Sequence, residues 1–266
     1  MEKNVQKVGV ISLGLIGGSI LKALCKKYDL YCYSTSLAKE AFNYSENISD
    51  NLEIIKDCDI VFVCSPISKT LEMLEKLENI VRKDCIVLDC ASVKKDFLNK
   101  KFNYNFIMSH PMAGREKTGF EASEEFLFKG AKWLVEKDNP LAKKIIEDTG
   151  ANMVITDMNK HDYMCDMISH LPMFLAYGLF SCADDNSKYI ASSGFRDMTR
   201  LVSNPLMSAD MLELNKDNID NALNNMIEKL NYLKNLSYNE KIKIFKELSK
   251  ERSKMYNEQG QNVFKP

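Results

Sequence analysis

The stretch VGVISLGLIGGSI, residues 8–20, combines a strand-like apolar run with a glycine-rich turn and the start of a helix. Its glycines follow the dinucleotide-binding pattern GxGxxG, except that Ser12 stands in place of the first. In such a turn the second glycine lets the backbone approach a pyrophosphate, and the third lets the helix pack on the strand. The helix N-terminus then offers N–H groups to the phosphates. We expect Ser12 to make the turn with a negative φ, and we expect the cofactor to be bound at Gly14, Leu15, Ile16 and Gly17.

Short apolar runs alternate with amphipathic segments up to residue 157. The expected helices between the runs include 18–27, 69–82 and 140–149. Near-continuous apolar runs suit parallel strands that are covered on both faces, and the alternation favours an α/β fold with a doubly wound, mostly parallel Rossmann sheet. The expected strands are 8–11, 30–34, 60–66, 85–90, 106–111, 132–136 and 152–156.

The strand pattern stops near residue 157. Residues 159–183 read as one long, mostly apolar helix, which Pro172 should kink by freeing the carbonyl group of Ile168. Residues 205–257 are almost wholly helical in pattern. We therefore predict a dinucleotide-binding domain over 1–157 and an all-α substrate and dimerisation domain over 158–266. A helix that is apolar on all sides should be buried, here in a homodimer.

Composition excludes several classes of function. Hydrophobic residues make up 45% of the 266 residues, and the formal net charge is −1. This balance argues against nucleic acid as a partner. No apolar run is long enough to span a membrane, and the N-terminus has no targeting pattern. The eight cysteines form no CxxC pair, so we expect reduced thiols in a cytoplasmic protein and no metal site.

The end of the second predicted strand bears on the choice of cofactor. An NAD site usually has an acidic residue there, which binds the ribose 2′-hydroxyl. This chain has Ser34 and Thr35 instead, and both hydroxyl groups can donate to a 2′-phosphate. No arginine follows, and the nearest basic residues are Lys39, Lys94 and Lys95. The cofactor is therefore predicted to be NAD or NADP, with a slight preference for NADP.

Polar residues stand where other predicted strands end. Ligands of a doubly wound sheet bind beyond the carboxyl ends of its strands. Ser65 and Pro66 end one strand, and Ser92 follows the next. His110 leads a loop that contains proline and glycine, beside the expected nicotinamide. A lone histidine is most often structural, but this position favours a catalytic His110.

The segments LGLIGGS, DCASVK, SHPMAGREKTG, HDYMCDMISHLP and GFRDMTR occur in this order. Together they resemble the prephenate/arogenate dehydrogenase family of tyrosine biosynthesis, from about residue 7 to about residue 235. The resemblance implies a Rossmann domain, a helical dimerisation domain and oxidative decarboxylation of a cyclohexadiene, with hydride transfer to NAD(P). It further implies that His110 accepts the proton of the substrate 4-hydroxyl and that Ser92 bonds the same hydroxyl.

The resemblance also supplies candidates for substrate binding. Arg200 would bind a substrate carboxylate, and the less favoured alternative is an ion pair between helices, for example with Asp197 or Glu213. Arg196 is the second basic candidate, Glu116 would gate the site or pair with a base, and His170 would bond the substrate or a helix carbonyl. His161 and Asp162 would orient their neighbours.

Three departures from the family pattern leave alternatives open. Met173 stands where many relatives have a second histidine after SHLP, so the substrate is prephenate or arogenate. Arg115 replaces a small polar residue, and Ser12 replaces a glycine. A related reductase, such as a β-hydroxyacid dehydrogenase or pyrroline-5-carboxylate reductase, is the second reading. A non-catalytic, nucleotide-responsive dimer is the third.

Overall fold

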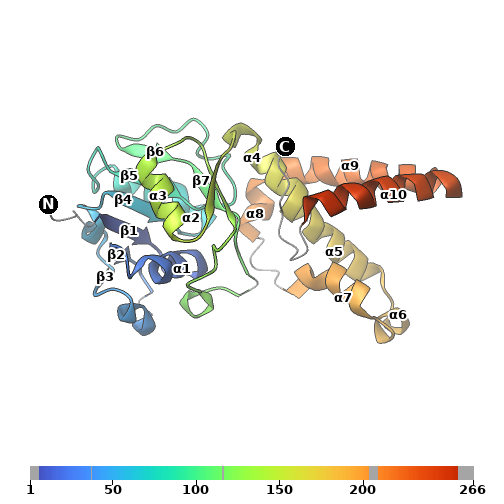
Figure 1. Cartoon of the computed structure of the whole chain (residues 1–266), viewed down its shortest axis with the longest axis horizontal. Helices are drawn as coiled ribbons and strands as arrows, with labels where there is room; N and C mark the ends of the chain where they lie inside the picture. Colours follow the sequence, from blue (N-terminus) through green and yellow to red (C-terminus); the bar gives the residue numbers. More distant parts are fainter. Residues whose placement is uncertain (1–5, 37, 116, 204–208, 257–266) are drawn as a thin grey trace. The chain divides into compact units, whose positions relative to one another are not determined.

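The computed structural model describes residues 6–36, 38–115, 117–203 and 209–256 (Figure 1). The chain divides into two units, residues 1–219 and 220–266. The first holds the sheets and the helices up to the start of α9, and the second holds the rest of α9 and α10. The predicted domain boundary after residue 157 stays a prediction.

Six parallel strands form the main sheet of the first unit, in the order β3-β2-β1-β4-β5-β6. The predicted doubly wound sheet is thereby confirmed. β3 was not predicted, because its three residues contain one apolar side chain and give no pattern. The strand order reverses between β1 and β4, where this fold binds its ligands. The strands are β1 (Lys7–Ile11), β2 (Asp29–Tyr33), β3 (Asn47–Ser49), β4 (Ile60–Val63), β5 (Ile86–Asp89) and β6 (Asn105–Ile107).

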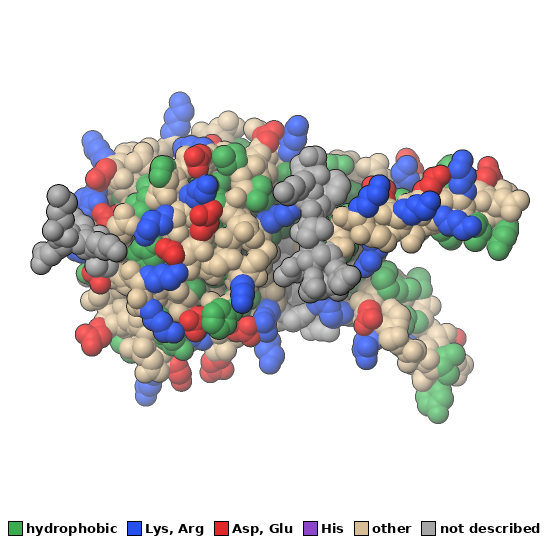
Figure 2. Space-filling model, in the orientation of Figure 1, with side chains coloured by type: hydrophobic (Ala, Val, Ile, Leu, Met, Phe, Trp, Pro, Cys, Tyr) green, Lys and Arg blue, Asp and Glu red, His purple; other side chains and the backbone are tan. Residues whose placement is uncertain are grey.

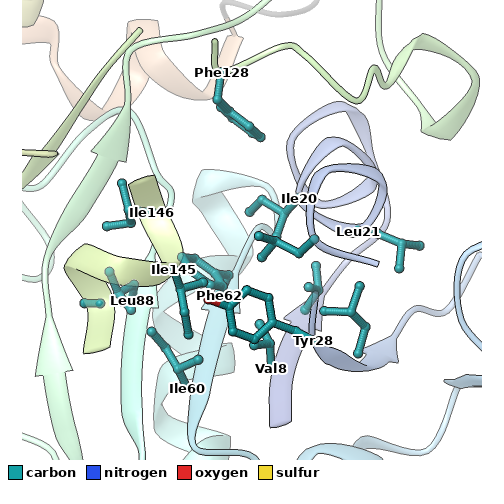
Figure 3. Packing of buried hydrophobic residues seen from close by; sticks show 14 of the residues in the cluster. Val8, Ile20, Leu21, Tyr28, Ile60, Phe62, Leu88, Phe128, Ile145 and Ile146 are labelled. Atoms are coloured by element: carbon teal, nitrogen blue, oxygen red, sulfur yellow. The ribbon is translucent and has the colours of Figure 1, made fainter. Parts of the chain in front are cut away.

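Helices cover both faces of this sheet. On one face α1 (Leu15–Leu24) and α3 (Pro140–Asp148) pack against Ile60 and Phe62 of β4 (Figure 3). On the other face α2 (Ile67–Leu77) packs against Val61 and Val63 of the same strand. Because successive side chains of a strand point to opposite faces, a strand covered on both faces must be apolar throughout.

The end of the predicted strand 106–111 belongs to a second, three-stranded sheet, which the sequence did not separate from the first. β7 (Ser109–Pro111) pairs antiparallel with β8 (Lys132–Val135), which pairs in parallel with β9 (Asn152–Ile155). The break after Met108 has a local cause. The Ser109 N–H donates to the Asp89 carboxylate at 2.9 Å instead of to a neighbouring strand. The carboxylate at the end of β5 thus turns the chain and starts the strand that carries His110.

The expected helix 159–183 consists of α4 (Met158–Cys165), a π-helical turn (Asp166–His170) and α5 (Leu171–Cys182). The Leu171 N–H bonds the carbonyl oxygen of Asp166, five residues earlier. The irregularity therefore lies in the turn before Pro172. The helices that follow α5 and precede α10 are α6 (Asp185–Tyr189), α7 (Ser193–Thr199), α8 (Ala209–Leu214) and α9 (Lys216–Asn235). Short 3-10 turns lie at Lys39–Asn43, Leu52–Ile55, Phe120–Ala122 and Arg200–Ser203.

The described residues of the second unit are mostly helical, in the rest of α9 and in α10, and charged and large apolar side chains are exposed on them. Ser237 and Glu240 cap α10 (Tyr238–Met255) reciprocally, which satisfies two of its first N–H groups. Among the described helices, none has the length and apolar character that crossing a membrane requires.

Candidate active site

Ser12 adopts a left-handed backbone conformation, with φ of 71°. The expectation of a negative φ was therefore wrong. A non-glycine residue in this region costs about 1–3 kcal/mol, which explains why a glycine is usual here. A methyl group on Gly17 would lie 2.0 Å from the carbonyl oxygen of Ser12. Gly17 is thus required for the close packing of α1 on this turn, as the sequence predicted.

Gly14 has a different environment, since a methyl group added to it would meet no atom within 4 Å. Gly14 precedes Leu15, the first residue of α1, and the first turn of that helix contains no acidic residue. The space beside Gly14 at this helix N-terminus is therefore open, and anionic ligands are favoured at such a position. The turn fits the diphosphate of a dinucleotide.

Ser34 at the end of β2 is buried, and its hydroxyl donates to the carbonyl oxygen of Ser36 at 2.8 Å. Its single proton is used within the loop, and the prediction that Ser34 donates to a 2′-phosphate stays a prediction. Thr35 beside it is exposed. Lys94, one of the basic residues considered for this site, is fully buried. Of the basic residues considered for NADP, Lys94 is thereby excluded, whereas Lys39 and Lys95 are exposed, as Thr35 is.

Thr35→Asp should shift the cofactor preference toward NAD. Two like charges about 4 Å apart in water repel by about 1 kcal/mol, or about 5-fold. We expect the ratio of kcat/KM with NADP to kcat/KM with NAD to fall by at least about this factor. Thr35→Asn, which adds no charge, is the matched control and should leave the ratio nearly unchanged. Equal ratios in both variants would place the ribose elsewhere.

A cleft of about 620 Å³ joins the dinucleotide turn to the predicted catalytic residues. It begins at the turn before α1, passes the ends of β4 and β5, and reaches the loop after β7 and the π-helical turn. The structure thus places the predicted nucleotide-binding and catalytic segments around one cavity. The predicted residues that line it are Gly14, Leu15, Ile16, Ser65, Pro66, Ser92, His110 and His170.

Other predicted site residues do not line this cleft. Arg196 on α7 is exposed and lies 3.4 Å from Asp197. Arg200 begins the following 3-10 turn and is also exposed. Glu116 lies outside the described residues.

The lining also includes Lys117, Cys165 and Ser169, which the sequence argument missed. Lys117 could have been predicted from the sequence, because it lies in the loop that follows His110.

His110 is held by a relay of hydrogen bonds from α4. Its Nδ1 lies 3.0 Å from Nε2 of His161, and Nδ1 of His161 lies 2.8 Å from the Asp162 carboxylate. The same carboxylate accepts the backbone N–H groups of Lys94 at 2.7 Å and Lys95 at 2.9 Å. Although burial raises it, the pKa of Asp162 is lowered overall by these hydrogen bonds. Asp162 is therefore a fixed negative charge behind His161.

This relay determines which ring nitrogens carry protons. The Asp162 carboxylate accepts a hydrogen bond from Nδ1–H of His161, so Nε2 of the neutral His161 ring carries a lone pair. His110 must then donate its own Nδ1–H to that lone pair. Its Nε2 consequently has no proton and is left as the acceptor for a ligand in the cleft.

Burial and the Lys94 ammonium lower the pKa of His110 well below its ordinary value, and His161 and His170 add to the effect. A lowered pKa keeps the imidazole neutral at physiological pH, and only the neutral ring accepts a proton.

Lys94 and Asp89 form a fully buried ion pair beneath this site. The Lys94 ammonium also donates to the carbonyl oxygens of Ala91 at 2.8 Å and Ser109 at 2.6 Å. Asp89 accepts the N–H groups of Ala91 at 3.1 Å and Ser109 at 2.9 Å. The pair therefore ties the loop that contains Ser92 to the strand that contains His110.

His170 lies at the end of the π-helical turn and is buried at the cleft wall. Its Nδ1 is 3.2 Å from the side-chain nitrogen of Asn215 and 3.3 Å from Asp166. Burial lowers the pKa of His170 to about 4 and raises the pKa of Asp166. A neutral His170 at the cleft wall is available for a hydrogen bond to the substrate, one of its two predicted roles.

Comparison with known proteins agrees with this arrangement. Residues 18–158 match the family model "Prephenate dehydrogenase, nucleotide-binding domain", and residues 157–251 match "Prephenate dehydrogenase, dimerization domain". Prephenate dehydrogenase of Lactococcus lactis is 30% identical over 247 residues, which cover 81% of this chain and 70% of that protein.

Two solved structures share the fold of nearly the whole chain. Synechocystis arogenate dehydrogenase has a TM-score of 0.81 at 26% identity, covering 94% of this chain and 99% of that one. Prephenate dehydrogenase from A. aeolicus, in complex with hydroxyphenyl propionate and NAD+, has a TM-score of 0.80 at 26% identity, with 95% and 99% covered. With both family models matched in sequence order, this chain belongs to the prephenate/arogenate dehydrogenase family.

Proposed function

We propose that this chain catalyses the oxidative decarboxylation of prephenate to 4-hydroxyphenylpyruvate, with hydride transfer to NAD+ or NADP+, in tyrosine biosynthesis. One observation carries the proposal. A single cleft has a dinucleotide turn at one end and, at the other, a neutral histidine whose tautomer is fixed by His161 and Asp162. A base in that form suits removal of a hydroxyl proton beside a nicotinamide.

The bound nicotinamide supplies the acceptor for the hydride that leaves C4 of the substrate. Nε2 of His110 accepts the proton of the 4-hydroxyl as the C–O bond gains carbonyl character. When the ring carboxylate leaves as CO₂ and the ring becomes aromatic, His110 returns this proton to the oxygen. The hydroxyl of Ser92, in the same cleft, bonds the reacting oxygen and orients it. The products are 4-hydroxyphenylpyruvate, CO₂ and the reduced cofactor.

Prephenate carries two carboxylates, which require positive partners. Lys117 lines the cleft and offers an ammonium group to one of them. We propose that Lys117 binds a substrate carboxylate. Arg200 stays the second candidate, although in this chain it is exposed and does not line the described cleft.

Lys117→Met should raise KM for prephenate by about 3- to 10-fold and change kcat little. A charge-assisted hydrogen bond contributes about 1.5 kcal/mol at the low end, and exposure to solvent weakens it further. Steady-state kinetics measure both constants. Lys143→Met on the exposed side of α3 is the control and should change neither constant. A normal KM in Lys117→Met together with a raised KM in Arg200→Gln would assign the carboxylate to the arginine.

Initial rates of cofactor reduction test the proposed function. Prephenate and arogenate are each supplied with NAD+ and with NADP+, and reduced nicotinamide is followed by absorbance. We expect turnover with prephenate. Turnover with arogenate alone would make the chain an arogenate dehydrogenase, the alternative that Met173 leaves open. No reduction with either substrate, despite measurable cofactor binding, would favour the non-catalytic reading.

We further propose a cytoplasmic homodimer formed by the helical residues. Large apolar side chains are exposed in the second unit (Figure 2). Residues 157–251 match a dimerization domain, so a second copy of this chain is the expected partner for these side chains. The exposed apolar residues of this unit are Ile227, Leu230, Tyr232, Tyr238, Phe245, Leu248 and Tyr256.

Sedimentation velocity at micromolar concentration should give the mass of a dimer. The physical reason is the number of large apolar side chains that a monomer would leave in water, among them Ile168 on the π-helical turn at 66% exposure. A double substitution, Leu230→Glu with Leu248→Glu, should shift the protein toward monomer. A compact monomer of the wild-type chain at this concentration would contradict the dimer.

A further inference from the structure

Three potential metal ligands meet behind the proposed base. Nδ1 of His110 lies 3.0 Å from Nε2 of His161, and Sγ of Cys165 lies 3.4 Å from that Nε2 and 3.8 Å from Nδ1 of His110. Zn–N bonds of about 2.0–2.1 Å and Zn–S bonds of about 2.3 Å imply ligand separations near 3.3 Å for N–N and 3.6 Å for N–S in a tetrahedral site. The three observed separations agree with these values to within about 0.4 Å.

We propose that His110, His161 and Cys165 form an inhibitory site for Zn²⁺. Two imidazoles and one thiolate are ligands that Zn²⁺ prefers. His161 and Cys165 are four residues apart on α4, so their side chains lie on the same face of the helix. His110 comes from β7, 51 residues earlier than His161. Because the ligands are so far apart in the sequence, and only one of them is a cysteine, no metal-binding spacing is visible in the sequence.

The surroundings support a cation at this position. Asp162 accepts Nδ1–H of His161 at 2.8 Å, which directs the Nε2 lone pair toward the other two ligands. A carboxylate behind a ligating histidine is the usual support of zinc sites. The Asp166 carboxylate, next to Cys165 in the chain, is fully buried. Lys94, which also lowers the pKa of His110, opposes a cation here, and its pairing with Asp89 reduces that opposition.

The thiol must lose its proton when the metal binds. Burial raises the pKa of Cys165 to about 12, so the thiol is protonated in the metal-free protein. A coordinating thiol is deprotonated by the ion itself, and metal binding then releases a proton. Three protein ligands leave the fourth zinc position for water or substrate, and both His110 and Cys165 line the cleft.

Inhibition follows from the tautomer of His110. In the metal-free protein Nδ1 carries the ring proton and Nε2 is the acceptor. A metal ion on Nδ1 takes the place of that proton, so the single proton of the neutral ring then resides on Nε2. Nε2 becomes a donor and is unable to accept the hydroxyl proton of the substrate. This consequence rests on the proposed function, whereas binding of the metal does not.

Co²⁺ and Zn²⁺ are the probes. Co²⁺ added to the wild-type chain should bind in a 1:1 ratio, with the near-ultraviolet charge-transfer band of a cobalt–thiolate bond, and Zn²⁺ should displace it. Cys165→Ala should lose the band. Cys182→Ala removes an exposed thiol outside the cluster and is the matched control, which should keep the band. The same band in Cys165→Ala, or no bound metal in the wild-type chain, would overturn the site.

The inhibitory effect is measured separately, as each variant's rate with Zn²⁺ divided by its own rate with a chelator. We expect this ratio to be low for the wild-type chain and for Cys182→Ala, and near one for Cys165→Ala. Bound zinc that leaves the wild-type rate unchanged would overturn the inhibitory role. If neither prephenate nor arogenate is turned over, the proposed function fails, while the cobalt spectrum still decides the site.

Discussion

His110→Asn should lower kcat for prephenate by about 10²–10⁴-fold, the usual loss when a general base is removed. Asparagine keeps much of the shape of the imidazole and has no basic nitrogen. The proton of the substrate hydroxyl then has no acceptor in the transition state, whereas the ground-state contacts of the substrate remain. KM should therefore change little, and the loss should be visible in steady-state and single-turnover rates.

Two controls separate this role from a structural one. Circular dichroism and cofactor affinity of His110→Asn should match those of the wild-type chain. In the presence of a chelator, kcat/KM of the wild-type chain should hold as the pH falls through the ordinary range of histidine. The reason is that burial and Lys94 lower the pKa of His110, so the neutral ring persists to lower pH. An acid limb in that ordinary range, unchanged in His110→Asn, would remove His110 from the role of base.

Lys94→Met should lower the free energy of unfolding by about 3–5 kcal/mol, the usual cost of leaving one charge of a buried pair without its partner. Both members of the Lys94–Asp89 pair are fully buried. The substitution also removes the donor to the carbonyl oxygens of Ala91 and Ser109. Chemical denaturation at neutral pH measures the change. A loss below about 1 kcal/mol would show that the Asp89 charge is satisfied without the lysine.

The double variant Lys94→Met with Asp89→Asn tests the cause of that loss. It has no unpaired charge, and the asparagine oxygen still accepts an N–H group from Ala91 or Ser109. Most of the lost stability should therefore return, because replacing both members of a buried pair is often nearly neutral. Lys76→Met breaks an exposed pair with Glu72 and should have a far smaller effect. Equal losses in the single and double variants would attribute the effect to packing.

The main strands other than β3, and the glycine turn, were predictable because their signals are local. An apolar run such as 60–63 is required wherever both faces of a strand are covered. Gly17 was predictable because close packing of the helix on the turn excludes a side chain. His110 lies on β7 of the second sheet and lines the same cleft as the nucleotide-binding turn, and its catalytic role stays a prediction.

The missed features depend on contacts between distant residues. The break between β6 and β7 is made by the Asp89 carboxylate, 20 residues before Ser109. The low pKa of His110 depends on Lys94 and on burial, neither of which has a sequence pattern. Lys94 resembles any other lysine in the sequence, and only the fold shows that it is buried against Asp89.

Product stoichiometry tests the central claim most directly. The purified wild-type chain is incubated with prephenate and NAD+ or NADP+, and reduced cofactor, CO₂ and 4-hydroxyphenylpyruvate are each quantified. We predict equal molar amounts of the three products, formed at a rate that His110→Asn lowers by about 10²-fold or more. The same measurement is made with arogenate. Cofactor that binds but is not reduced, with no CO₂ released from either substrate, would contradict the assignment of this cleft as a dehydrogenase active site.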